Sequence, residues 1–184
     1  MISNLMNTIL QQELKKILNG RFSQSESTRL NYSRGEDTYD PILSKAVVFP
    51  ETNEEVSKIL KLCNEHKVPV VPFGTGTSLE GNVVGNDKGI TISLEKMNKV
   101  LTVNAQDFDC RVQACVTREQ LNDYLREDGV FFPIDPGANA AIGGMASTSA
   151  SGTMAVKYGT MKTVITGLTV VLPNGEIRIQ EEEQ

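Results

Sequence analysis

The sequence predicts an α+β fold built as two lobes, a small lobe with parallel strands followed by a larger antiparallel lobe. Three observations support this prediction. Residues 46–94 alternate short apolar strands with one helical pattern, an order that favours parallel pairing. A glycine-rich loop separates two of these strands. Residues 99–184 contain strand patterns joined by a tight turn, which favour antiparallel pairing.

The composition is that of an ordinary globular protein, with 39% hydrophobic and 22% charged residues in a chain of 184. The net charge of −5 and the lack of a basic stripe argue against a nucleic-acid surface. No apolar run approaches the roughly 18–20 residues that span a bilayer. Cys63, Cys110 and Cys115 have no CxxC spacing and His66 is the single histidine, so we expect free thiols and no metal site.

The N-terminal region is expected to be a helix and a connector outside the main domain. Residues 1–22 have the pattern of an amphipathic helix that ends at Gly20, and their polar interruptions are unlike a signal peptide. Residues 22–44 are polar and are interpreted as an extended connector that wraps a surface, or as a partly ordered arm. The expected organisation is a helix and connector over 1–40 and a main domain over 41–184, with lobes at 46–98 and 99–184.

In the first lobe, strands are expected at 46–49, 68–71 and 90–94. Thr52 is expected to cap the intervening helix, with Glu55 as its capping-box partner. The helical spacing predicts a buried face made of Val56, Ile59, Leu60 and Cys63.

In the second lobe, a helix is expected to begin after Thr117, with Gln120 as box partner, and to end at Gly129. Its buried face is expected to include Leu121, Tyr124 and Leu125. A Pro-Asn-Gly turn at 173–175 indicates a hairpin. The strands predicted in this lobe are 100–103, 111–116, 165–172 and 176–179.

The glycine-rich segment 72–82 (PFGTGTSLEGN) has the character of an anion-binding loop. Glycines let a ligand approach the backbone, and successive N–H groups form an anion nest beside the hydroxyl donors. Three or four charge-assisted hydrogen bonds, each worth roughly 1.5–3 kcal/mol, would hold a diphosphate. The loop has no Lys, which disfavours a Walker loop and a nucleotide-dependent transferase, and Leu79 stands where the Rossmann fingerprint needs a third glycine. A plain surface turn is the alternative.

A second small-residue segment covers 132–152 (FPIDPGANAAIGGMASTSASG). Pro133 and Pro136 shape a turn before Gly137, and a short helix is expected over 145–150 after the double glycine. The N-terminus of that helix would offer free N–H groups to an anion, and its small side chains would let a flat ring approach the backbone. The alternative is a flexible linker. In the following KYGTM segment, Tyr158 fits a packed aromatic better than a site residue.

The order and spacing of four segments resemble the FAD-linked oxidase family that shares the vanillyl-alcohol oxidase/p-cresol methylhydroxylase (PCMH) FAD-binding fold. The branch that looks most similar contains glycolate oxidase and, more closely, the cytochrome-linked D-lactate dehydrogenases. The resemblance covers about residues 40–179 and implies an α+β fold with FAD between a small parallel and a larger antiparallel lobe. The segments are VVFPETNEEVSKIL, VPVVPFGTGTSLEG, the stretch 116–161 and LTVVLPNGEI.

The resemblance also implies which residues bind the cofactor. It assigns the FAD diphosphate to Gly74, Thr75, Gly76, Thr77 and Ser78. The other cofactor residues that it implies are Pro72, Leu79, Gly81, Pro136, Gly137, Gly143, Gly144, Ser147, Ser149, Ser151, Gly152 and Val156. Residues 145–152 read MASTSASG, the form typical of the D-lactate dehydrogenase branch. The glycine-rich loop has no histidine, so non-covalent FAD is expected.

By this resemblance the chain is the FAD-binding portion of a dehydrogenase that oxidises a D-2-hydroxy acid such as D-lactate to a 2-oxo acid. Cytochrome c or a quinone would accept the electrons. In the family this domain continues further and a substrate domain with the catalytic Arg and His follows, so we expect a C-terminally incomplete fold without catalytic residues. The alternative is a catalytically inactive FAD-binding fragment or interaction module that needs a second polypeptide. A cytoplasmic or membrane-peripheral location is expected, with a mitochondrial one as the alternative.

Overall fold

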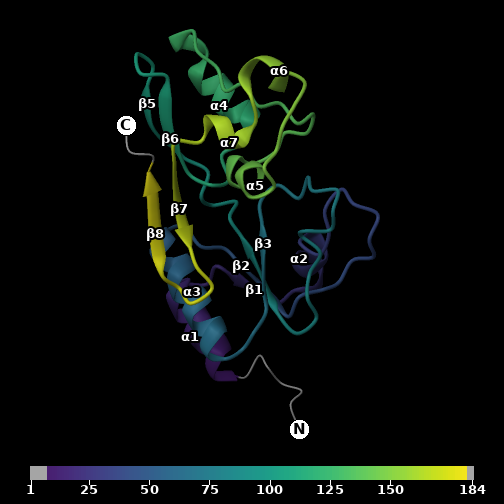
Figure 1. Cartoon of the computed structure of the whole chain (residues 1–184). Coiled ribbons are helices and arrows are strands. Elements are labelled where there is room, and N and C mark those ends of the chain that lie inside the picture. The colour runs from purple at the N-terminus through teal and green to yellow at the C-terminus, as the bar shows by residue number, and fades with distance from the viewer. Residues whose placement is uncertain (1–7, 182–184) are drawn as a thin grey trace.

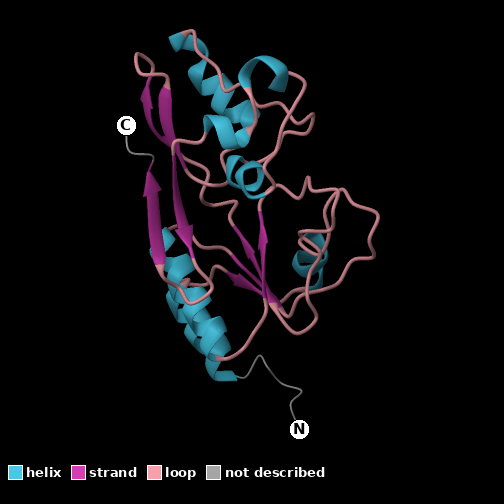
Figure 2. Cartoon of the chain, viewed as in Figure 1, coloured by secondary structure: helices cyan, strands magenta, loops and turns pink. Residues whose placement is uncertain are grey.

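The computed structural model describes residues 8–181, which form two lobes joined by a long hairpin (Figure 1). The first lobe is built on a four-stranded sheet in the order β1-β2-β4-β3. The central strand β4 pairs in parallel with both β2 and β3, as predicted, and β1 pairs antiparallel to β2 (Figure 2). The strands of this sheet are β1 (Phe22–Ser23), β2 (Ala46–Val48), β3 (Val70–Phe73) and β4 (Ile90–Ser93).

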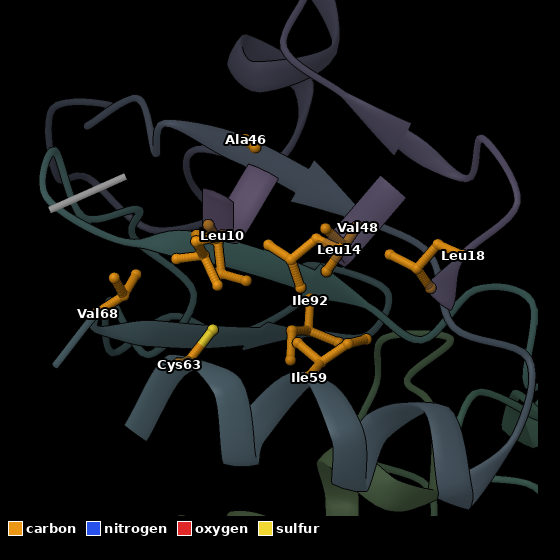
Figure 3. Close-up of a cluster of buried hydrophobic side chains, with 10 residues drawn as sticks. Leu10, Leu14, Leu18, Ala46, Val48, Ile59, Cys63, Val68 and Ile92 are labelled. Atoms are coloured by element: carbon orange, nitrogen blue, oxygen red, sulfur yellow. The ribbon is translucent and has the colours of Figure 1, made fainter. Parts of the chain in front are cut away.

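One face of this sheet is covered by two helices, α1 (Thr8–Ile17) and α3 (Asn53–Glu65), which contact each other. Ile59 and Cys63 of α3 point toward the strands, where they meet leucines of the N-terminal helix (Figure 3). These buried apolar side chains form the main hydrophobic core of the first lobe, and their removal from water stabilises it. Its buried members are Leu10, Leu14, Leu18, Ala46, Val48, Ile59, Cys63, Val68, Ile90 and Ile92.

The two ends of α3 bear out part of the sequence prediction. Thr52 is the N-cap, and its hydroxyl accepts a hydrogen bond from the backbone N–H of Glu55 at 3.2 Å. The Glu55 carboxylate accepts from the backbone N–H of Glu51 at 2.7 Å and from Arg21. His66 is the C-cap residue of the helix.

The region before β2 is more ordered than predicted. Part of the helix predicted over 1–22 lies outside the described residues, and within α1 the residue Ile9 is 61% exposed. The stretch 22–44, predicted to be an extended connector, contains β1 and the helix α2 (Glu26–Asn31), which Ser25 caps. The rest of this stretch, with α2, covers the second face of the sheet, where the Thr91 hydroxyl donates to the Ser44 hydroxyl at 2.8 Å.

The second lobe begins with the antiparallel pair β5 (Val100–Asn104) and β6 (Asp109–Val112) and continues into α4 (Arg118–Leu125). The predicted strand 111–116 begins earlier, at Asp109, and ends at Val112, after which the N–H of Val116 donates to the Gln113 carbonyl in a turn. The hydroxyl of Thr117 caps α4 as predicted, but Tyr124 is exposed rather than buried. The remaining helices are the 3-10 turn η1 (Arg126–Asp128), α5 (Ile142–Ser147), α6 (Ala155–Tyr158) and α7 (Met161–Val164).

The last two strands, β7 (Gly167–Val171) and β8 (Ile177–Glu181), form the predicted hairpin, with Gly175 at φ +84° in its turn. The turn packs on α3 of the first lobe, where the Ser57 hydroxyl donates to the Gly175 carbonyl. Within residues 8–181 the antiparallel lobe consists of two separate two-stranded sheets, β5-β6 and β7-β8. Also within these residues, no helix is long and apolar enough to cross a membrane.

A bidentate ion pair fastens the end of the N-terminal helix region to α3. The Arg21 guanidinium donates to both Glu55 carboxylate oxygens, at 2.8 and 2.5 Å, and its side chain and that of Glu55 are only 18% and 19% exposed. Hydrogen bonding to Arg21 lowers the pKa of Glu55 below its ordinary value. A lowered pKa contributes stability that is present above the unfolded-state value of about 4.3 and is lost as the pH falls through the folded-state value.

We expect Glu55→Gln to cost roughly 1.5–3 kcal/mol of unfolding free energy at pH 7 and to flatten the pH dependence below about pH 5. Urea denaturation at pH 7, 5, 4 and 3 measures both effects. Glu54→Gln is the matched control, because Glu54 is exposed on the same helical turn. Parallel stability profiles for wild type and Glu55→Gln would contradict the assignment.

Candidate functional site

A large cleft of about 3060 Å³ runs between the two lobes. The glycine-rich loop after β3 forms one wall, and the segment that contains α5 forms another; α5 lies beyond the C-terminal end of β3 (Figure 1). The volume exceeds the roughly 300–1,000 Å³ of typical small-molecule sites. The cleft therefore has room for an extended ligand that reaches from one lobe to the other.

The loop 74–79 presents unused backbone donors to this cleft. Within residues 8–181, no hydrogen bond uses the N–H groups of these six residues as donors. Its hydroxyl groups come from Thr75, Thr77 and Ser78 and lie at the same wall. Unpartnered N–H groups in successive residues form a concave positive surface, which suits a diphosphate.

Gly76 is required for the local backbone geometry of the loop. Its φ is +75°, and a Cβ atom at this position would lie 2.8 Å from the Phe73 ring. The Thr75 hydroxyl accepts a hydrogen bond from the backbone N–H of Ala141 at 3.3 Å. This bond ties the glycine-rich loop directly to the start of α5, so the two motifs found in the sequence form one site wall.

The start of α5 differs from the prediction. The helix begins at Ile142, so it contains the double glycine instead of following it. The N–H groups of Ala141, Ile142 and Gly143 donate to Thr75, Val116 and Ala114, which fixes the start of the helix against neighbouring segments. These three donors are therefore not free for an anion, whereas the hydrogen bonds of the described residues include none from the Gly144 N–H.

The two glycines of the pair have different surroundings. A Cβ atom on Gly143 would lie 2.8 Å from the Ala114 Cβ and 2.9 Å from the Ala114 carbonyl oxygen, so packing excludes a side chain there. A Cβ atom on Gly144 would meet no protein atom within 4 Å. Gly144 is exposed at the cleft, where a ligand can approach its backbone.

Most of the residues that the sequence singled out are gathered at this cleft. Those that line it are Pro72, Gly74, Thr75, Gly76, Thr77, Ser78, Leu79, Pro136, Gly137, Gly143, Gly144, Ser147 and Ser151. Four others do not line it: Gly81, Ser149, Gly152 and Val156. The Tyr39 ring packs against Gly81, and Val156 is fully exposed.

The need for glycine at position 152 is structural, and it comes from Asp135, a residue that was not predicted to matter. A Cβ atom on Gly152 would overlap the backbone and carboxylate oxygens of Asp135. The Asp135 carboxylate accepts hydrogen bonds from the Thr153 hydroxyl at 2.6 Å and the Met154 backbone N–H at 3.2 Å. The Thr153 hydrogen bond is the main reason that the pKa of Asp135 is lowered. The sequence feature that could have indicated Asp135 is its place as an acidic residue between prolines and glycine, in the segment 133–137.

The cleft has few basic side chains that could bind a carboxylate. Among the described residues that line it, Arg111 is the one cation, and histidine is absent. The thiols of Cys63 and Cys110 also line it, but burial raises the pKa of both, which keeps them protonated and unreactive. The other ionisable side chains at the cleft are the carboxylates of Glu36, Glu51, Glu54, Glu80 and Asp109.

Comparison with known proteins gives one family match and several relatives. Residues 44–179 match the model of the FAD binding domain family. The chain is 46% identical over 155 residues to a probable mitochondrial D-lactate dehydrogenase of Danio rerio, covering 84% of this chain and 31% of the relative. It is 42% identical over 170 residues to the mitochondrial D-lactate dehydrogenase (cytochrome) of Arabidopsis thaliana, covering 91% of this chain and 30% of the relative. The chain thus spans about a third of the length of these relatives.

Solved structures with the same fold include an alkyldihydroxyacetonephosphate synthase, with a TM-score of 0.86 at 22% identity. That match covers 97% of this chain and 35% of the other. A p-cresol methylhydroxylase with substrate bound has a TM-score of 0.79 at 24% identity, covering 96% of this chain and 35% of the other. At these identities the likeness shows the fold alone, which is the predicted α+β PCMH-type fold.

Proposed function

The chain belongs to the FAD-binding domain family, whose cofactor is FAD, and from this premise we propose that it is the FAD-binding portion of a flavin-dependent dehydrogenase. The enzyme would oxidise a D-2-hydroxy acid such as D-lactate to a 2-oxo acid. The observation that carries the proposal is the row of unpartnered N–H groups over 74–79 at the wall of a cleft between two lobes. The names of the D-lactate dehydrogenase relatives support the substrate class.

The residues at the cleft fit the cofactor. The N–H groups of 74–79, with the Thr77 and Ser78 hydroxyls, would bind the diphosphate. Gly144, which has open space at the position of a side chain, would let the cofactor lie against the backbone of α5. Bound FAD supplies the two-electron acceptor for the hydroxy acid. Histidine is absent from the described cleft residues, and we propose that groups outside residues 8–181 accept the hydroxyl proton and help to bind the substrate carboxylate.

The remaining features of the proposal come from the relatives and from the cleft. A cytochrome-type acceptor is favoured by the name of the Arabidopsis relative, and a mitochondrial location by the names of both relatives described above. Non-covalent FAD is favoured because histidine is absent from the described cleft residues.

The test is an FAD titration of the purified chain, followed by visible absorbance and flavin fluorescence. We expect saturable binding with one FAD per chain, release of all flavin on acid precipitation, and no bleaching of the flavin by D-lactate. Flavin that stays with the precipitated protein would contradict non-covalent attachment. Bleaching by D-lactate would show that the substrate groups are already present in this chain, and a folded chain without FAD binding would reject the proposed site.

A second candidate function is that of an inactive FAD-binding module completed by another polypeptide. The β7-β8 hairpin supports it, because Ile177 and Ile179 of β8 are 37% and 69% exposed and that strand has one unpaired edge among the described residues. Size-exclusion chromatography with light scattering tests it. A monodisperse yellow monomer favours the first proposal, whereas a chain that aggregates until a second polypeptide is co-expressed favours this one.

A further inference from the structure

The connector between α2 and β2 runs alongside the glycine-rich loop and its continuation, and contacts them at three glycines. The Glu36 backbone N–H donates to the Gly76 carbonyl at 3.0 Å. The Tyr39 ring lies against Gly81, and the Gly85 N–H donates to the Ser33 carbonyl at 2.9 Å. The loop is therefore supported along its length by a segment that was predicted only to wrap a surface or to be partly ordered.

The connector is itself held in place at both sides of Gly35. Its start is anchored by Tyr32, whose ring packs edge-on to the Phe73 ring with centroids 5.0 Å apart and whose hydroxyl donates to Glu95. After it, the Asp37 carboxylate accepts from the backbone N–H groups of Gly35 at 3.1 Å and Tyr39 at 3.0 Å. These contacts fix the backbone that faces the loop.

At Gly35 the connector approaches the loop too closely for any side chain. A Cβ atom there would lie 2.7 Å from the Gly76 carbonyl oxygen and 2.8 Å from the Ser78 carbonyl oxygen. Both carbonyls therefore face the connector. In a planar trans peptide the C=O and the following N–H point in opposite directions. The N–H groups of Thr77 and Leu79 are thereby turned away from the connector, and both residues line the cleft.

We propose that Gly35 is a positioning residue for the cofactor loop: its close contact orients the Gly76 and Ser78 peptides so that the next N–H groups point to the ligand. Gly35 is not itself among the residues that line the cleft. The inference rests on the proposed FAD site and adds to it an element that acts on the ligand only through the loop.

The test compares Gly35→Ala with Gly89→Ala. A Cβ atom on Gly89 would also overlap a backbone carbonyl oxygen, that of Pro69 at 2.3 Å. Gly89 precedes β4, so it lies at the end of the parallel sheet opposite to the loop. Kd for FAD is measured well below the melting temperature of each variant. We expect Gly35→Ala to raise Kd at least about tenfold, the loss of one charge-assisted hydrogen bond, while Gly89→Ala lowers Tm and leaves Kd unchanged. An unchanged Kd in Gly35→Ala, or an equal rise in both variants, would overturn the proposal.

Two further measurements keep the outcome decisive. If Gly35→Ala does not fold, Asp37→Ala removes two acceptors without adding atoms, and its Kd must rise if the connector positions the loop. If the wild-type chain does not bind FAD, cleavage after the exposed Glu80 by a glutamyl endopeptidase reports on the loop directly, with the exposed Glu127 as internal reference. Faster cleavage at Glu80 in Gly35→Ala, but not in Gly89→Ala, supports the positioning role while the FAD proposal fails. Equal rates overturn the positioning role as well.

Discussion

Gly144→Val is expected to remove most of the FAD affinity of the chain and to leave its fold intact. A Cβ at position 144 has no atom from other parts of the protein within 4 Å, and the residue is exposed, so we expect the valine side chain to be accommodated. The side chain would project into the cleft and occupy the space proposed for the cofactor. Overpacking of a filled site costs about 1–3 kcal/mol, which corresponds to roughly a fivefold to 150-fold rise in Kd. Gly144→Ala is expected to give a smaller rise.

Gly143→Val is the matched control, because it places the same side chain one residue earlier. There the added atoms overlap Ala114, whose carbonyl oxygen accepts the Gly143 N–H at 2.8 Å, so we expect a loss of stability. Thermal melting of the apoprotein and FAD titration separate the two results. Wild-type FAD affinity in Gly144→Val would show that the cofactor does not lie against α5, and a loss of stability would show that position 144 has no room for the side chain.

The first lobe was predictable because its signals are local. Local sequence is enough to predict the Thr52 cap, the apolar periodicity of α3 and the short strands that begin at 46 and 90. Each of these features depends on residues only a few positions away in the sequence. The parallel pairing of β2, β3 and β4 is favoured by the helix and the long loop that connect them, but the central place of β4 was not predicted. Strand β3 is displaced by two residues and includes Pro72, which pairs with Ile92. This strand lies at the edge of the sheet, where a residue without an N–H is tolerated.

The site was predictable in composition but not in the reason for each residue. Packing excludes a side chain at 143, where Ala114 is close, and at 152, where Asp135 is close, whereas at 144 we propose that glycine keeps the approach to the backbone open. The sequence alone does not distinguish these three reasons for a glycine, because the neighbouring residues that differ between them come from other segments of the chain. The contact of Gly35 with Gly76 joins residues 41 positions apart, which no local pattern indicates.

The division of the chain at residue 40 is a prediction that one substitution can test. Leu14 is fully buried in the cluster that also contains Val48, Ile59 and Ile92 (Figure 3). If residues 1–40 were an independent appendage, truncating Leu14 would leave the unfolding of the main domain unchanged. We expect instead that Leu14→Ala lowers the free energy of unfolding by about 2–5 kcal/mol, the range for a buried leucine that leaves a cavity.

Ile9→Ala provides the comparison on the same helix, because the Ile9 side chain is mostly exposed and its loss should change the stability by less than about 0.5 kcal/mol. Urea denaturation followed by far-UV circular dichroism measures both variants. One cooperative transition, shifted as a whole in Leu14→Ala, would make α1 a structural part of the first lobe. The N-terminal helix would then support the sheet from which the cofactor loop emerges, because α1 shares a core with that sheet and contacts α3. Two transitions, with the larger one unshifted, would instead establish the boundary at residue 40.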